Sequence, residues 1–163
     1  GSGNQGMTVS IPVIEYAKEI HASEQTLYRA LVLANLVSIY QKVFIGKLSA
    51  YCGAVSAAAG AVSGIAWLDG ESEEIIKKTI INTICTVGGM VCDGAKPSCA
   101  SKVAAALGTA ILSLEMAKRG SAFSVGEGLV MDTAENTIKS IGRMASQGME
   151  NTDNIILQIM LGN

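Results

Sequence analysis

The chain has few aromatic residues and almost no histidine or proline. Of its 163 residues only 4% are aromatic, one is histidine and two are proline. The core must therefore consist of Ala, Ile, Leu, Val and Met, and abundant Ala with little Pro favours helices. A Ser-His-Asp triad would have to use His21, and nothing near His21 supports one. We expect His21 at the end of a helix or on the surface.

Charge is also scarce, and neither sign dominates. Charged residues make up 16% of the chain and the net charge is −2. The basic surface typical of nucleic-acid binding is missing, so no nucleic-acid partner is expected. Neither end carries a signal-peptide pattern. Four cysteines without such a pattern indicate a reducing compartment, where metal binding or catalysis outranks disulfides. We therefore expect a cytoplasmic protein.

Apolar spacing and capping residues predict helices along the whole chain. Ser10 and Pro12 are typical of a helix start, and Ser23 and Gly46 bracket a second helix. Ser72, followed by Glu73 and Glu74, is typical of another start. No strand-like alternation stands out. The helices are expected at about 11–21, 24–45, 49–68, 73–85, 99–118, 132–148 and 155–161. Asp132 with Glu135 is expected to start the sixth helix, and Asn151 or Thr152 to cap the seventh. The prediction is an all-α compact bundle of about seven helices, forming a single domain over residues 1–163.

One helix is unlike the others. The segment from Ala50 to Leu68 contains no charge, is rich in Ala, Gly and Ser, and is long enough to span a membrane. Large apolar residues drive membrane insertion, and this segment has few of them. We interpret it as the central helix of the bundle, buried on every side, with small side chains that let its neighbours pack closely. No membrane partner is expected.

The stretch from Cys92 to Cys99 places two cysteines seven positions apart around Gly94 and Pro97. Proline disfavours helix at the preceding residue and glycine is a weak helix former, so the stretch is predicted to be a loop between two helices. A loop that holds two thiols near the start of a helix is better suited to a metal or cluster than to a hydrophobic core. A helix N-terminus lowers a thiol pKa, and the thiolate is the form that binds metal.

Cys52, Cys92 and Cys99 all fall at predicted helix ends or loops. Three thiolates can hold three corners of a cubane iron–sulfur cluster, whose fourth iron is then open to substrate as a Lewis acid. A structural zinc site would need a fourth ligand from His21 or Cys85. Spacing alone leaves cluster, zinc and no metal open. Cys85 itself continues an apolar helix face and is expected in the core.

The first six residues and two lysines also leave alternatives open. The opening run from Gly1 to Gly6 fits either a tail or a Gly-rich turn whose Asn4 and Gln5 amides face a ligand carboxylate. Lys42 and Lys47 flank the predicted helix stop at Gly46. Either both lysines lie at a solvent-exposed helix end, or one of them binds a substrate carboxylate.

Three stretches together resemble the serine dehydratase-like alpha family, and in particular its branch of L-cysteine desulfidase and uncharacterised relatives. These stretches are Gly1-Ser2-Gly3-Asn4-Gln5-Gly6, Leu48-Ser49-Ala50-Tyr51-Cys52-Gly53-Ala54-Val55 and Met90-Val91-Cys92-Asp93-Gly94-Ala95-Lys96-Pro97-Ser98-Cys99. The resemblance extends over the whole chain, and its three-cysteine pattern is specific. It also implies that most of the opening run is native.

The resemblance implies a cofactor and a reaction. Members of this family bind an oxygen-labile 4Fe–4S cluster through three cysteines, which map onto Cys52, Cys92 and Cys99. They eliminate hydroxyl or thiol from a small L-amino acid, serine or cysteine, and the products are pyruvate and ammonia without pyridoxal phosphate. Asn4 and Gln5 match a motif expected at the substrate. Asp93 and Lys96 lie beside the cysteines, and we expect Lys96 to contact substrate and Asp93 to support the ligands.

One departure from the family concerns length. Family members carry a further N-terminal region, which in the desulfidase branch supplies an additional functional cysteine. The chain therefore resembles the C-terminal, cluster-bearing domain of a lyase, expected to be inactive alone and to need that region as a partner. The catalytic base is expected outside the chain, and the purified protein can lack its cluster. A homo-oligomer is compatible with the sequence. The alternative hypothesis is a non-catalytic helical interaction or regulatory domain whose cysteines serve packing.

Overall fold

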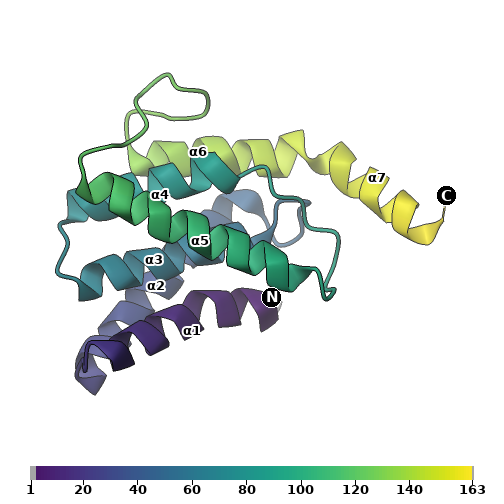
Figure 1. Cartoon of the computed structure of the whole chain (residues 1–163). Helices are drawn as coiled ribbons and strands as arrows, with labels where there is room; N and C mark the ends of the chain where they lie inside the picture. The colour runs from purple at the N-terminus through teal and green to yellow at the C-terminus, as the bar shows by residue number, and fades with distance from the viewer. Residues whose placement is uncertain (1–2, 163) are drawn as a thin grey trace.

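The computed structural model describes residues 3–162, which form seven α-helices, one short π-helical segment and no strand. The elements are α1 Gly3–Glu19, α2 Glu24–Ile45, α3 Gly53–Leu68, α4 Glu73–Val87, α5 Cys99–Lys118, α6 Ala134–Arg143, η1 Met144–Gly148 and α7 Glu150–Leu161. The predicted all-α bundle is confirmed. Figure 1 shows α1, α2, α4 and α5 gathered around α3, with α6 lying across one side and α7 extending away.

Helix α3 is the centre of the bundle. Twelve of its sixteen residues are buried, and it packs against α1, α2, α4 and α5. Its glycines allow close contact with α2: a Cβ added to Gly60 would lie 2.4 Å from the Ala34 carbonyl oxygen, and one added to Gly64 would lie 2.9 Å from the Ala30 carbonyl oxygen. The interpretation of this segment as a buried, closely packed helix is therefore confirmed, although it starts at Gly53 rather than near residue 49.

Several predicted helix ends are confirmed by their capping hydrogen bonds. The Ser23 hydroxyl accepts from the Thr26 amide and starts α2, and the Ser72 hydroxyl accepts from the Ile75 amide and starts α4. Gly46 ends α2 with a φ of 94°. His21 lies exposed just beyond α1, as expected for a helix end. These caps supply partners for amides that have none inside their helices.

Three further predicted helix starts are wrong. Helix α1 begins at Gly3, so the described part of the opening run is helical rather than a Gly-rich turn, and Pro12 lies inside the helix. A proline removes one helical hydrogen bond but does not prevent the helix from continuing on its N-terminal side. Thr133, not Asp132, caps α6. Helix α7 begins at Glu150 directly after the π-helical turn, with no side-chain cap.

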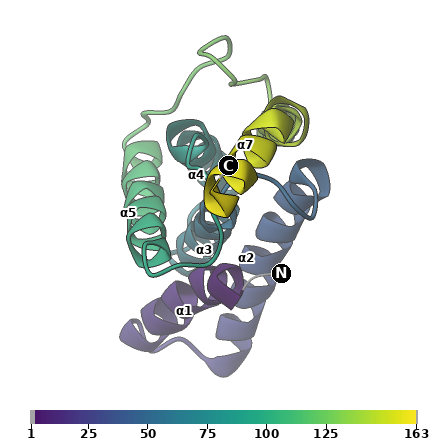
Figure 2. The ribbon, with the colours of Figure 1, turned by 90° about the vertical axis from the view of Figure 1, so that its right-hand side faces the viewer.

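Helix α7 is an arm rather than part of the bundle. None of its residues is buried, and Figure 2 shows it running outward toward the end of the bundle where α3 begins. Its Met160 methyl lies 3.6 Å from the position of a Cβ added to Gly94, so the arm passes close to the cysteine loop. The arm leaves several large apolar side chains exposed, namely Ile155, Leu157, Ile159, Met160 and Leu161.

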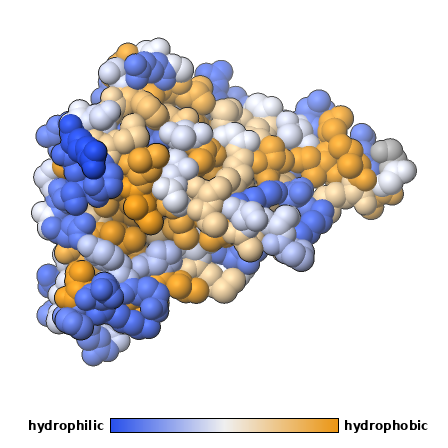
Figure 3. Space-filling view, in the orientation of Figure 1, coloured by the Kyte–Doolittle hydropathy of each residue, from blue (hydrophilic) through white to orange (hydrophobic). Residues whose placement is uncertain are grey.

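Apolar side chains also lie on the outside of the bundle. Figure 3 shows them spread between blue polar regions on the face where α5 lies in front. Among the described helices, only α5 is both long and apolar enough to span a membrane by length and composition. It buries one face in the bundle through Ala106, Ala110 and Leu114. Length and composition alone are weak evidence for a membrane span, because core helices meet the same criterion.

Candidate functional site at the three cysteines

A short antiparallel bridge joins the two segments that carry the cysteines. Tyr51 pairs with Val91. The Cys52 amide donates to the Met90 carbonyl at 3.0 Å, and the Cys92 amide donates to the Ala50 carbonyl at 2.6 Å. Because the two chains run side by side here, cysteines forty positions apart in the sequence become neighbours in space.

The third cysteine is the first residue of α5, and Cys52 is the N-cap of α3. Two of the three thiols therefore lie at helix N-termini, where the aligned peptide dipoles favour negative charge. The loop folds over Cys99: the Lys96 amide donates to its sulfur, and the sulfur lies 3.5 Å from the Gly94 carbonyl oxygen. Gly94 has a φ of 91°, a conformation that side chains other than glycine rarely adopt.

All three thiols line one cavity of about 70 Å³. The other lining residues come from the start of α1, the start of α3, the cysteine loop and α5. They are Asn4, Gln5, Gly53, Ala54, Gly94, Ala95, Lys102 and Val103. The sequence-predicted residues Cys52, Cys92, Cys99, Asn4 and Gln5 are thus brought together. We call this space the thiol cavity.

The contacts of Gln5 explain why a glycine follows Cys52. The Gln5 carboxamide nitrogen donates to the Ser38 hydroxyl at 3.3 Å, which fixes the side chain against α2. Its oxygen would lie 3.2 Å from a Cβ added to Gly53. Any larger residue at this position would press against Gln5, so Gly53 lets α1 and α3 approach at the cavity.

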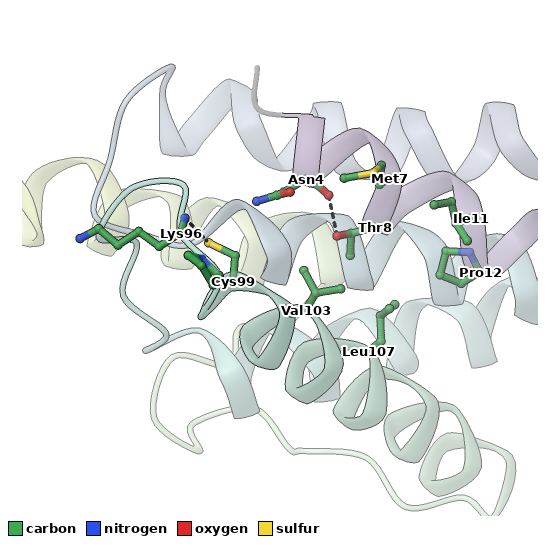
Figure 4. Close-up of a pocket in the computed structure, with 11 residues that line it drawn as sticks. Asn4, Met7, Thr8, Ile11, Pro12, Lys96, Cys99, Val103 and Leu107 are labelled. Carbon is green, nitrogen blue, oxygen red and sulfur yellow. Dashed lines mark hydrogen bonds between the residues drawn. The ribbon is translucent and has the colours of Figure 1, made fainter.

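Asp93 and Lys96, predicted beside the cysteines, have different positions. Asp93 forms an ion pair with Lys102 at 2.5 Å. Lys96 does not line the thiol cavity; it lines a neighbouring groove between α1 and α5. Figure 4 shows the Lys96 side chain extended from the loop, with its ammonium pointing away from Asn4. The cation in the thiol cavity is therefore Lys102, a residue that the sequence analysis missed.

Lys102 could have been found from its spacing. It follows Cys99 by three positions, and residues three apart in an α-helix share a face. Its ammonium donates to the Val91 carbonyl at 2.9 Å and to Asp93 at 2.5 Å. Each of these acceptors lies next to Cys92, so one side chain of α5 holds the loop on both sides of that cysteine.

The groove between α1 and α5 adjoins the thiol cavity. It has a volume of about 500 Å³ and shares Asn4, Cys99 and Val103 with the thiol cavity. Figure 4 shows the apolar side chains of Met7, Ile11, Val103 and Leu107 along it. The groove gives the thiol cavity an open, mainly apolar approach.

The spacing of the thiols distinguishes between kinds of metal site. Within residues 3–162, no three His, Cys, Asp or Glu side chains lie close enough together to hold one metal ion. Thiolates bound to one zinc lie about 2.3 Å from it, and hence about 4 Å from one another. A cluster spreads its thiolates over different irons and accepts wider spacing. The three cysteines therefore do not lie as the ligands of one zinc ion would, and the chemistry of their thiols is that of an iron–sulfur donor set.

Burial shifts the pKa of one thiol of the cavity and of a lysine on α2. Desolvation raises the pKa of the Cys52 thiol, while the nearby Lys102 ammonium acts in the opposite direction. Burial lowers the pKa of Lys42, and the charge of Cys92 opposes this shift. Lys42 is thus half-buried on the side of α2 that faces the cysteine loop, whereas Lys47 is exposed. Of the two lysines considered from the sequence, Lys42 is the one near the site.

Cys85 does not belong to this site. It lies on α4, half-buried against the main core, beside a surface hollow lined by Phe123 and Leu129. Burial raises the pKa of its thiol to about 11. The expectation that Cys85 packs in the core rather than contributing to the cysteine site agrees with this position.

Fold and site together define a helical domain with a three-thiol cavity built between two helix N-termini. The family model described as serine dehydratase alpha chain matches residues 1–158, and the chain belongs to this family. The resemblance inferred from the sequence motifs is confirmed at the level of the family. No solved protein structure matches the chain.

Relatives with the name UPF0597 protein match nearly the whole chain. The one from Lachnoclostridium phytofermentans is 53% identical over 161 residues, which cover 99% of this chain and 39% of the relative. The one from Treponema denticola is 52% identical, covering 99% and 37%. One from Bacteroides fragilis is 44% identical, covering 98% and 37%. The chain thus spans about two fifths of the length of the curated relatives that it matches.

Proposed function

We propose that this chain is the cluster-bearing part of an iron–sulfur-dependent lyase that eliminates hydroxide or hydrosulfide from L-serine or L-cysteine. The observation that carries the proposal is the thiol cavity, where Cys52, Cys92 and Cys99 meet the amides of Asn4 and Gln5. Membership of the serine dehydratase alpha chain family supports this class of reaction.

The three cysteines are the residues that would hold a 4Fe–4S cluster. Such a cluster, when bound by three thiolates, supplies an open iron that acts as a Lewis acid toward the leaving group. The protein contributes the setting: two helix N-termini favour negative charge, and Lys102 adds a positive charge. The bridge between Tyr51 and Val91 fixes the two cysteine-bearing segments relative to each other.

Asn4 and Gln5 are proposed to bind the amino acid. Both lie in the first turns of α1, at the boundary between the thiol cavity and, for Asn4, the groove. Carboxamides can donate to a carboxylate and accept from an ammonium group, so they suit a zwitterionic ligand. Lys96 was predicted to contact substrate, but it lies on the groove side with its ammonium turned away, so we place it outside the reacting part of the site.

The proposed reaction balances without a redox change. A base removes the α-proton, the bond from Cβ to oxygen or sulfur breaks, and hydroxide or hydrosulfide departs with the electron pair. The resulting aminoacrylate becomes an imine and takes up water, giving pyruvate and ammonia. The residues around the thiol cavity do not distinguish serine from cysteine, because the two substrates differ only in the leaving atom. The base is proposed to come from the region that the longer relatives carry in addition.

Anaerobic reconstitution tests the proposal. Incubation with ferrous iron and sulfide should give a brown protein with four irons per chain, the content of one such cluster. Cys92→Ser should lose most of this iron because the cavity is left with two thiolates, whereas Cys85→Ser should retain it. A wild-type protein that takes up no iron, or a Cys92→Ser variant that binds as much as wild type, would refute the proposed site.

Activity is a separate test. We expect the chain alone to show no turnover of L-serine or L-cysteine, and we expect turnover when it is combined with the remaining region of a UPF0597 relative. Pyruvate and sulfide or ammonia release are the readouts. Turnover by the isolated chain would show that the base lies within residues 1–163, and half-buried Lys42 would then be the first candidate.

A further inference from the structure

We propose that Lys102 is the positioning residue of the thiol cavity: it fastens the Cys92 segment to α5 and places a positive charge among the three thiols. The claim that the Lys102 charge acts on a bound cluster rests on the proposed function. The claim that Lys102 holds the Cys92 segment against α5 does not, because it concerns contacts within the protein alone.

The fastening follows from the hydrogen bonds of one ammonium group. Its bonds to the Val91 carbonyl and the Asp93 carboxylate span the residue between them, which is Cys92. Lys102 belongs to the helix that Cys99 begins, so these bonds fix the distance between two cysteines that come from different elements. The Lys102 side chain is 24% exposed, so most of it is covered by the protein.

The charge argument follows from the lining of the cavity. Among the described residues that line it, Lys102 is the one cation. The hydrogen bond to Asp93 raises the pKa of Lys102 and outweighs the opposing effect of burial, so the ammonium stays charged beside the thiols. An ammonium has three N–H donors. Two are used by Val91 and Asp93, which leaves one for what occupies the cavity.

Three variants test the inference. Lys102→Gln removes the charge and shortens the reach, Lys102→Arg keeps the charge, and Lys96→Gln is the matched control because it removes a nearby lysine that does not line the cavity. In iron-free protein, hydrogen exchange of the 91–96 amides should become about tenfold faster in Lys102→Gln, and remain unchanged in Lys96→Gln.

The second readout is the iron content and reduction potential of the protein after anaerobic reconstitution. Lys102→Gln should bind less iron after anaerobic reconstitution, and its remaining cluster should have a more negative reduction potential because a positive charge is gone. Lys102→Arg should restore both properties in large part, which a merely structural role would not predict for the potential. Unchanged exchange together with an unchanged potential in Lys102→Gln would overturn the inference. Failure of wild type to bind iron would instead refute the proposed function, while the exchange experiment still decides the fastening.

A second inference rests on a different surface and is independent of the site. We infer that the outer face of α2 is a contact surface for a second copy of this chain. The face, which we call the α2 stripe, consists of six exposed apolar or aromatic residues: Tyr28, Val32, Leu36, Ile39, Tyr40 and Val43. From residue 30 to residue 45, every exposed residue of α2 belongs to the stripe, and none is charged.

The stripe has the spacing of a packing ridge. Tyr28, Val32, Leu36 and Tyr40 follow one another at intervals of four, the arrangement that packs helices at about −50°. A ridge of this kind can pair with its own copy about a two-fold axis through its middle, near Leu36. Beside it runs a groove of about 400 Å³, to which Leu36 and Tyr40 contribute, and which Ile76 of α4 also lines.

The size of the stripe favours a second copy as the occupant. It leaves on the order of 600 Å² uncovered, so pairing two copies would bury about 1,200 Å², the lower end of the range for stable interfaces. The other exposed apolar faces are less bulky or less continuous. On α5 the exposed residues between Ser101 and Glu115 are also uncharged, but three of them, Ala104, Ala105 and Gly108, are small, and α7 intersperses its apolar residues with Asp153 and Gln158.

A charge at the centre of the stripe tests this inference. Light scattering and sedimentation should show a dimer for wild type at micromolar concentrations. Leu36→Glu should weaken dimerisation at least about a hundredfold, since the symmetric contact buries the new charge twice. Leu112→Glu is the matched control, because Leu112 is 59% exposed and Leu36 is 58% exposed. Circular dichroism verifies that both variants fold. A monomeric wild type, or a Leu36→Glu variant that dimerises as wild type does, would overturn the inference.

Discussion

The close contact between α2 and α3 makes Gly60 the most informative position for a stability test. In Gly60→Ala the new methyl would lie 2.4 Å from the Ala34 carbonyl oxygen, 3.1 Å from Val9 and 3.2 Å from Ser38. The nearest of these atoms belongs to the backbone and cannot rotate away. The helices must therefore separate by roughly 1 Å, which costs about 3 kcal/mol at the upper end of overpacking penalties.

The opposing effect of alanine on the helix is smaller. Alanine is about 1 kcal/mol better than glycine in a helix interior, so Gly60→Ala should lose about 2 kcal/mol in net free energy of unfolding. Gly108→Ala is the control: it lies in α5 with nothing within 4 Å of the added methyl, and it should gain up to about 1 kcal/mol. The two substitutions are chemically identical and should change stability in opposite directions.

Thermal unfolding and urea unfolding, both followed by circular dichroism, measure the two variants. For a chain of this size, the melting temperature should fall by about 4–8 °C in Gly60→Ala and rise by about 2–4 °C in Gly108→Ala. The slope of the unfolding free energy with urea should stay the same, because the unfolded surface is unchanged. A Gly60→Ala protein as stable as Gly108→Ala would refute the close approach of α2 to α3.

Two further predictions concern tyrosines. The Tyr51 hydroxyl is buried and has no hydrogen-bond partner within the described residues. In urea unfolding, Tyr51→Phe should therefore leave the free energy of unfolding unchanged or raise it by about 1 kcal/mol. A loss of more than about 1 kcal/mol would show that the hydroxyl has a partner. The hydrogen bond from Tyr16 to Asp69 raises the pKa of Tyr16 to about 12. The protonated tyrosine is the stabilising form, so this contribution is present below pH 10 and is lost as the pH rises from 10 to 12. Wild type should therefore lose stability faster than Tyr16→Phe over that interval, and parallel curves would contradict the assignment.

The sequence was most informative where capping residues mark a helix. Ser23 and Gly46 gave the limits of α2, and Ser72 gave the start of α4, because side-chain caps are local interactions. The beginning of α3 was placed too early because uniform apolarity carries no stop signal, and the extended residues 49–52 depend on pairing with a distant segment. The start of α1 was misplaced because Ser10 and Pro12 form a local start signal that the preceding helix overrides.

The site was predictable in its thiols but not in its charges. Cysteine spacing and the family motifs singled out the three residues that meet at the cavity. They also pointed to Lys96, which is close to Cys99 in sequence but whose side chain faces away from Asn4 in space. Lys102 was missed because its role depends on a loop that folds back onto α5. Neighbours in sequence are a poor guide to neighbours in a loop, where side-chain direction follows the backbone turns.

The Tyr51–Val91 bridge has a consequence for the order of events during synthesis. Cys52 precedes Cys92 by forty positions, so it leaves the ribosome about 2–8 s earlier at ordinary translation rates. Until α4 is complete and Val91 reaches Tyr51, the first thiol has no partner and no cavity around it. If the three thiols hold a cluster as proposed, it can be inserted only after the loop has been translated, because the cavity does not exist before Val91 pairs with Tyr51.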